Sequence, residues 1–164
     1  MLSDPRPLRT VQITLSFLLA TYLLLIVFNN LKVYGANYDF VRNVADMTTV
    51  FSTGEQWRSV SQPLILHLFY LIIIALETLG GVLCMLGAWR MWRARRAEYA
   101  IFRTAKALST YGVLAGIVTW LGIFIAVGGE WFLMWQSKWN ALPTAYNLTA
   151  CFGISLLIFL KEEA

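Results

Sequence analysis

Charged residues are scarce in this sequence. Asp, Glu, Lys and Arg make up 13% of its 164 residues, which is about half the share found in a typical soluble domain. Hydrophobic residues make up 59%, and the mean hydropathy is +0.63. This composition excludes a soluble globular domain and predicts an integral membrane protein.

Histidine and cysteine are also rare. One histidine, His67, cannot supply bis-His haem ligation, and Cys84 and Cys151 lie inside separate apolar runs with no Cys/His metal spacing. No glycine-rich phosphate loop, catalytic triad or pair of membrane carboxylates is visible in the sequence. We therefore expect no catalytic, cofactor or metal site and no enzymatic activity. The basic residues flank apolar runs without a nucleic-acid motif, so we expect no nucleic-acid partner.

Four apolar runs are long enough to cross a bilayer, which takes about 20 residues of helix. They predict an all-α fold, a four-helix integral membrane bundle that forms one domain over residues 1–164. We expect the spans at about 11–28, 64–89, 109–128 and 144–160.

Lys and Arg are distributed unevenly between the connecting segments. Six Lys or Arg residues lie between residues 90 and 106, and together with three near the two ends of the chain they make nine. The loop between the first and second spans and the loop between the third and fourth spans hold four in total. Because positively charged loops stay in the cytoplasm, we expect both termini to be cytoplasmic. A specific anionic-lipid or phosphate site in the basic stretch is the alternative interpretation of its charge.

The second span contains ionisable and polar residues that must face protein or water, because their burial in lipid is costly. Steps of three and four place His67, Tyr70 and Glu77 on one helical face, followed by small residues. We expect the other spans to pack on this face. Glu77 is expected to be buried and protonated, with Thr119, Tyr22, Asn147 or a backbone carbonyl as its hydrogen-bond partner.

Packing faces can also be predicted for the third and fourth spans. Gly112 and Gly116 form a GxxxG pattern that lets another helix approach closely, and we expect this face to meet the second span. Its predicted continuation at helical spacing is Thr119, Ile123, Ala126 and Glu130. In the fourth span the expected packing edge is Asn147, Ala150, Cys151 and Ile154.

The first outer loop, residues 29–62, shows amphipathic spacing. Phe40, Val44, Met47 and Phe51 lie at i, i+4, i+7 and i+11 and predict one short helix at the bilayer surface or against a partner. Ser52 with Glu55, or Thr53 with Gln56, is a capping-box pattern that predicts a further helix leading to Pro63.

The second outer loop is rich in tryptophan, which is typical of a membrane-interface belt. Its polar residues are too dense for a belt alone, so we expect an interaction surface built from both outer loops. The candidate residues are Phe40, Val44, Met47, Phe51, Trp57, Glu130, Trp131, Trp135, Gln136, Trp139 and Asn140.

Several strings together carry a family resemblance. They are Asn37-Tyr38-Asp39, the Phe40, Val44, Met47 and Phe51 pattern, Trp57-Arg58, the His67, Tyr70 and Glu77 pattern, and residues 129–140, which are the most specific. The chain resembles the bacterial family of predicted small integral membrane proteins catalogued as domain of unknown function 2165. The resemblance covers nearly the whole chain and implies four spans in a bacterial inner membrane, but no activity. The chain departs from the family pattern at Asn43 and Thr48.

Two kinds of function remain open besides the less favoured enzyme or electron carrier. The leading hypothesis is a non-catalytic accessory or assembly subunit that lies in the lipid bilayer and binds a larger membrane protein. The alternative is a small proton-coupled carrier, acting as a homo-oligomer, in which Glu77 releases and takes up the proton. The lack of broken helices at the membrane midplane counts against the carrier.

Overall fold

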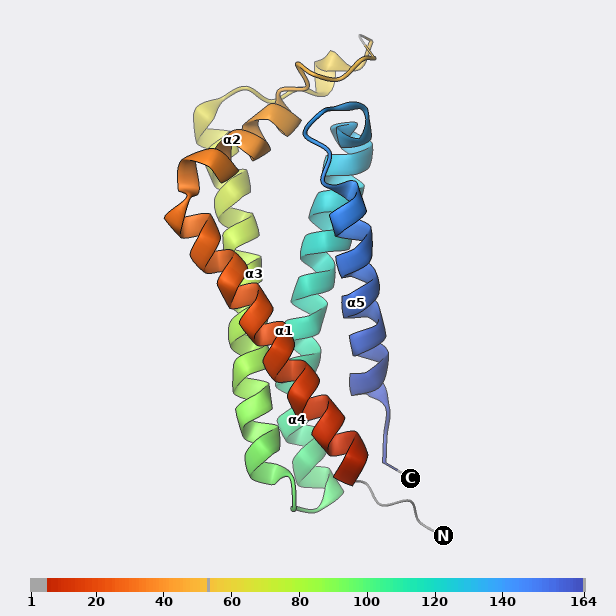
Figure 1. Cartoon of the computed structure of the whole chain (residues 1–164). Helices are drawn as coiled ribbons and strands as arrows, with labels where there is room; N and C mark the ends of the chain where they lie inside the picture. Colours follow the sequence, from red (N-terminus) through yellow and green to blue (C-terminus); the bar gives the residue numbers. More distant parts are fainter. Residues whose placement is uncertain (1–5, 53, 164) are drawn as a thin grey trace.

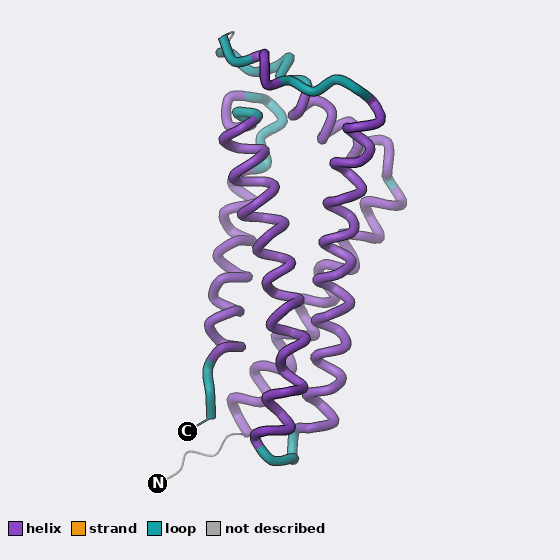
Figure 2. Tube along the Cα trace, turned by 180° about the vertical axis from the view of Figure 1, so that it is seen from behind, coloured by secondary structure: helices purple, strands orange, loops and turns teal. Residues whose placement is uncertain are grey.

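The computed structural model describes residues 6–52 and 54–163, and every regular element in these residues is helical (Figures 1 and 2). The elements in chain order are α1 (Arg6–Lys32), α2 (Tyr34–Ala45), η1 (Gln56–Arg58), α3 (Pro63–Ala94), α4 (Tyr99–Ile117), η2 (Val118–Trp131), η3 (Met134–Gln136) and α5 (Leu142–Leu160).

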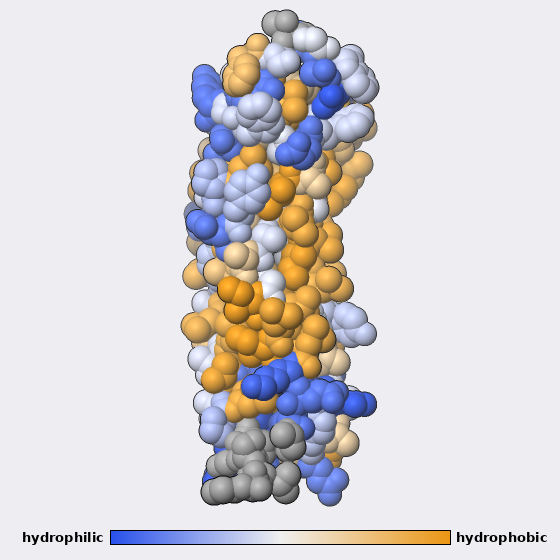
Figure 3. Space-filling view, turned by 90° about the vertical axis from the view of Figure 1, so that its right-hand side faces the viewer, coloured by the Kyte–Doolittle hydropathy of each residue, from blue (hydrophilic) through white to orange (hydrophobic). Residues whose placement is uncertain are grey.

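Four helical stretches are long and apolar enough to span a membrane: α1, α3, α4 with η2, and α5. This confirms the predicted all-α bundle with four spans, although the first three helices extend several residues beyond the predicted bounds. Figure 3 shows an apolar belt between two hydrophilic ends. The start of α1, the α3–α4 turn and the end of α5 lie at one end, and α2, η1 and η3 lie at the other (Figure 1). We name these the inner end and the outer end after the orientation expected from the sequence.

The inner halves of α3 and α4 approach very closely. A Cβ added at Gly112 of α4 would lie 2.8 Å from the carbonyl oxygen of Gly80 and 2.8 Å from the backbone nitrogen of Cys84, both on α3. Ser16 of α1 donates a hydrogen bond to the Cys84 carbonyl at 2.7 Å, so a third helix is tied to the same point. Close packing of small residues is the usual basis of helix association in lipid, and the predicted contact of Gly112 with the second span is confirmed.

Gly116 does not share this partner. A Cβ at Gly116 would meet the ring of Phe152 on α5, so the two glycines of the GxxxG pattern face different helices. The predicted packing edge of the fourth span is also wrong, because α5 packs against Gly116 through Phe152. The buried residues of α5 include Ala145, Phe152, Ser155 and Phe159, whereas the predicted ones are exposed, namely Asn147, Ala150, Cys151 and Ile154. The large Phe152 ring fills the space that Gly116 leaves.

The third span changes its helical geometry half way. From Val118 to Trp131 it is a π-helix, η2, and at its end the Phe132 amide donates to the carbonyl of Val127, five residues back, at 3.0 Å. The turn of a π-helix holds more residues than an α-turn, so the α-spaced face predicted from the sequence is not maintained. Thr119 is buried, but Ala126 and Glu130 are exposed.

The first outer loop contains a shorter helix than predicted. α2 ends at Ala45, and Met47 takes a positive φ of 55°, which turns the chain out of the helix. Phe51 is therefore not on the helix, and the prediction of one helix through all four apolar positions is wrong. The expected second helix is only the three-residue turn η1, without a side-chain cap; the alternative cap at Thr53 lies outside the described residues.

Candidate functional site

Glu77 lies in the middle of α3 and is 1% exposed. Asn30, near the end of α1, donates a hydrogen bond from Nδ2 to Glu77 Oε2 at 2.7 Å. The partners predicted from the sequence are therefore wrong. The Thr119 hydroxyl donates instead to the carbonyl of Ala115 at 3.0 Å, and Asn147 is exposed on α5. Whether Glu77 is protonated stays a prediction.

Asn30 joins three helices at this point. Its Oδ1 accepts a hydrogen bond from Asn37 Nδ2 of α2 at 3.0 Å, and its backbone carbonyl accepts one from the Tyr70 hydroxyl of α3 at 2.9 Å. Side-chain hydrogen bonds between helices hold membrane bundles together where the hydrophobic effect cannot. Asn30 therefore ties α1 and α2 to the polar face of α3.

His67 continues the polar face of α3 toward the outer end. Its Nδ1 is hydrogen-bonded to the Tyr34 hydroxyl at 2.8 Å, and its ring stacks on Tyr38 with 4.1 Å between centroids. Tyr34 also lies 4.8 Å from the ring of Tyr70. We call these residues together the outer polar cluster: Asn30, Tyr34, Asn37, Tyr38, His67, Tyr70 and Glu77.

The outer polar cluster is only partly visible in the sequence. The three members from α3 were predicted to share an inward face, and Tyr70 and Glu77 are buried while His67 is half-buried. The four members from α1 and α2 were missed, although Asn30, Tyr34, Asn37 and Tyr38 follow helical spacing of i, i+4, i+7 and i+8. The chain bends at Val33, between α1 and α2, and after the bend Tyr34 and Tyr38 contact His67 of α3, while Asn37 bonds to Asn30.

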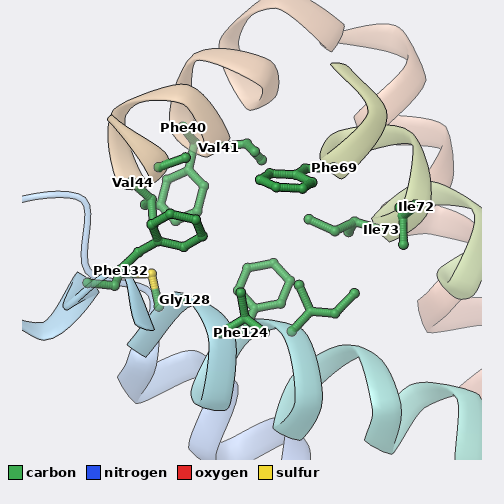
Figure 4. Close-up of a pocket in the computed structure, with 13 residues that line it drawn as sticks. Phe40, Val41, Val44, Phe69, Ile72, Ile73, Phe124, Gly128 and Phe132 are labelled. Atoms are coloured by element: carbon green, nitrogen blue, oxygen red, sulfur yellow. The ribbon is translucent and has the colours of Figure 1, made fainter. Parts of the chain in front are cut away.

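An apolar cavity of about 250 Å³ lies between α2, α3 and η2 near the outer end (Figure 4). Phe69 and Ile73 line it from α3, Phe124 from η2, and Phe40 and Val44 from α2. Glu77 is not part of the lining, and the lining residues offer no acid or base. Among the residues the structure describes, no three His, Cys, Asp or Glu side chains come together as a metal site would require.

The two outer loops meet at the outer end. Phe51 packs edge-on against Trp135 at 5.9 Å between ring centroids, and Trp57 packs against Trp131 at 5.8 Å. The amide of Ser52 donates to Gln136 Oε1 at 3.1 Å, and the hydroxyls of Thr49 and Ser137 are hydrogen-bonded. The loops thus form one structure from segments about 80 residues apart in the sequence.

The predicted interaction residues divide by exposure. Phe51, Trp57, Trp131 and Trp135 are exposed, and we call these four the outer aromatic surface; Glu130 and Asn140 are exposed beside them. Three more are half-buried, namely Phe40, Gln136 and Trp139. Val44 and Met47 lie in the core beneath the loops, so their assignment to an accessible surface is wrong. Val44 lies on the apolar face of α2, and Met47 follows the end of that helix in the same core cluster.

Arg9 connects three segments at the inner end and was not singled out by the sequence. Its guanidinium donates to both carboxylate oxygens of Glu163, at 2.6 and 2.7 Å, and to the carbonyls of Arg95 and Ala97. It also lies 4.7 Å from the ring of Phe102. Arg9 is thus a buried tie between α1, the α3–α4 turn and the C-terminal segment, in addition to its contribution to the charge distribution.

The fold and the buried polar cluster define a small helical integral membrane protein. The chain belongs to the family described as predicted small integral membrane protein (DUF2165), whose model matches residues 8–162. The match confirms the family resemblance stated above. No curated protein and no solved structure matches the sequence.

Proposed function

We propose that this protein is a non-catalytic accessory or assembly subunit that binds a larger membrane protein through its outer aromatic surface. The observation that carries the proposal is the exposure of Phe51 and Trp57, at 73% and 71%. Both lie in the loop that covers the outer ends of the spans (Figure 1). Exposed aromatic residues grouped in one patch mark interaction sites, and tryptophan is enriched among the residues that contribute most to binding.

The construction of this surface supports binding rather than membrane anchoring alone. The guanidinium of Arg58 lies 5.4 Å from the Trp57 ring and 5.6 Å from the Trp131 ring, and it donates to the carbonyls of Glu130 and Trp131. The rings are therefore fixed in place before a partner arrives. A pre-organised surface loses less conformational entropy on binding, whereas an interface belt requires only that each ring reaches the headgroup depth.

We place the protein in the bacterial inner membrane with both termini in the cytoplasm. The uneven distribution of Lys and Arg supports this orientation. The start of α1, the basic α3–α4 turn and the end of α5 share the inner end (Figures 1 and 2), so one assignment of sides accommodates all three. The outer aromatic surface would then face the opposite side of the membrane.

The proposal is tested by co-purification of a tagged chain after extraction in a mild detergent. The double variant Trp57→Ala with Trp135→Ala should accumulate in the membrane but lose a stoichiometric larger partner. Trp89→Ala is the matched control, because Trp89 is also exposed but belongs to the inner part of α3. If the outer variants keep every partner and instead insert or extract poorly, these tryptophans only set membrane depth and the proposal is wrong.

A proton-coupled carrier is the second candidate, favoured by the hydrogen bonds that link Glu77 through Asn30 to Asn37 of α2. The cluster offers a polar connection from Glu77 toward the outer end. In proteoliposomes with an imposed pH gradient, Glu77→Gln would abolish proton-coupled uptake while the protein accumulates normally. Purification as a homodimer without a larger partner would favour this candidate over the first.

A further inference from the structure

A basic pocket of about 210 Å³ lies at the inner end, between the start of α1 and the end of α3. The polar residues that line it from α1 are Arg6, Arg9, Thr10 and Thr14, and the residues from α3 and the turn that follows are Trp92, Arg95 and Arg96. No carboxylate belongs to this lining among the described residues. Planar guanidinium groups with hydroxyls beside them match the geometry of phosphate oxygens.

An apolar groove of about 390 Å³ continues from this pocket along α1 and α3. Phe17 lines it from α1, and Met85, Ala88 and Trp89 line it from α3. The pocket and the groove share Ile13, Thr14 and Trp92, so they are continuous. Met85 lies seven residues before Trp92, which places the end of the groove about 10 Å deeper along the helix at ~1.5 Å per residue.

We propose that the pocket and groove together bind one anionic phospholipid. The headgroup phosphate would lie beside Arg95 and Arg96, and one acyl chain would follow the groove. The arginines of the pocket favour an anionic group. The groove that begins at the pocket favours a ligand whose apolar part is attached to that group and extends into the hydrocarbon layer. A phospholipid satisfies both conditions, and basic pockets between membrane helices are known to hold such headgroups.

The pocket is shaped in advance by contacts that do not use the ligand. Arg95 donates from Nη1 to the Trp92 carbonyl at 2.8 Å, and its guanidinium lies 4.3 Å above the Trp92 ring. Arg9 holds the Arg95 carbonyl and also donates to Glu163 and to the carbonyl of Ala97. Arg9 is therefore a positioning residue, and the exposed Arg96 is the side chain that we expect to contact the phosphate most directly.

The test is a lipid titration of the purified full-length protein, with bound lipids counted by native mass spectrometry. We expect one phosphatidylglycerol to bind at least tenfold more tightly than phosphatidylcholine. Arg96→Gln should weaken phosphatidylglycerol binding about fivefold, the effect of one arginine near a lipid headgroup. Arg103→Gln is the matched control, because Arg103 is an exposed arginine near the inner end that does not line the pocket. Equal weakening by both variants, or equal affinity for the two lipids, would overturn the proposal.

A second variant tests the groove separately from the charge. Thr14 is exposed and lines both the pocket and the groove, so Thr14→Trp should block the chain without disturbing buried residues. We expect loss of phosphatidylglycerol binding with unchanged helix content and unchanged thermal unfolding of the lipid-free protein. Normal lipid binding by this variant would refute the role of the groove. Displacement of phosphatidylglycerol by millimolar inorganic phosphate would show a site for free phosphate and would overturn the lipid assignment.

Discussion

The hydrogen bond between Asn30 and Glu77 gives the most direct test of how the outer half of the bundle is held together. Glu77→Leu removes the acceptor and leaves Asn30 Nδ2 without its partner. Glu77→Gln keeps an amide oxygen in nearly the same place, so the bond from Asn30 can still form. The two replacements therefore separate loss of the hydrogen bond from loss of the ionisable group.

The expected size of the effect follows from the burial of the bond. A buried polar group left unsatisfied costs about 1–3 kcal/mol, while measured interhelical hydrogen bonds in membranes average only about 0.6 kcal/mol and reach about 1.7. Glu77 is almost completely enclosed and Asn30 also connects α2. We therefore expect a coupling free energy of about 1 kcal/mol between the two positions, above the average for membrane proteins.

A double-mutant cycle measures this coupling. The free energy of unfolding in lipid is compared for Glu77→Leu, Asn30→Leu and the double variant, and the cost of the double variant should be smaller than the sum of the single costs. Glu77→Gln should stay within ~0.5 kcal/mol of the wild type, since the hydrogen bond is retained. Asn147→Leu, on the exposed face of α5, is the matched control and should show no coupling to Glu77. Additive single costs at Asn30 and Glu77 would refute the structural role of this bond.

Three further predictions concern other parts of the bundle. Gly112→Leu should prevent stable accumulation, because the backbone of α3 occupies the space that the leucine side chain needs. Gly153→Leu is the control and should accumulate normally, since nothing lies within 4 Å of a Cβ at that position. Immunoblots of membrane fractions compare the two variants. Arg9→Gln should speed tryptic cleavage after Lys161, because it releases Glu163. Arg103→Gln is the control and should leave the cleavage rate unchanged. Equal cleavage rates in the two variants would contradict the role of the Arg9–Glu163 ion pair. Reporters fused after Leu31, Arg95, Lys138 and Ala164 should report outside, inside, outside and inside, respectively. An outside signal at Arg95 would overturn the topology.

The spans and the inward face of α3 were predictable because hydrophobic length and intramembrane charge are strong local signals. Glu77 and Tyr70 could face only protein, and the small residues after them continue the same helical face. The partner of Glu77 was not predictable from the same information. It depends on the tilt of α1 that brings Asn30 beside α3 (Figure 1), and no local pattern in the sequence encodes this tilt.

The errors on α5 and η2 have a different cause. In a bilayer both lipid and protein are apolar, so hydrophobicity does not show which side of a helix packs, and small residues such as Ala150 can face lipid at little cost. Phe152 is buried only because Gly116 leaves room for its ring. The π-helical geometry of η2 then shifts every later position around the axis, which no rule based on a period of 3.6 residues can anticipate.

The inner and outer halves of the bundle differ in how they are stabilised. In the inner half, Gly80 and Gly112 allow direct backbone contact between α3 and α4, and Arg9 ties three segments together. In the outer half, α3 carries large side chains toward its neighbours, so α3 and η2 stand apart around the apolar cavity (Figures 1 and 4). There α1 and α2 are held to α3 by polar and aromatic contacts. The outer aromatic surface is therefore carried by the half that side-chain contacts hold together, while direct backbone contact keeps the spans in register in the inner half.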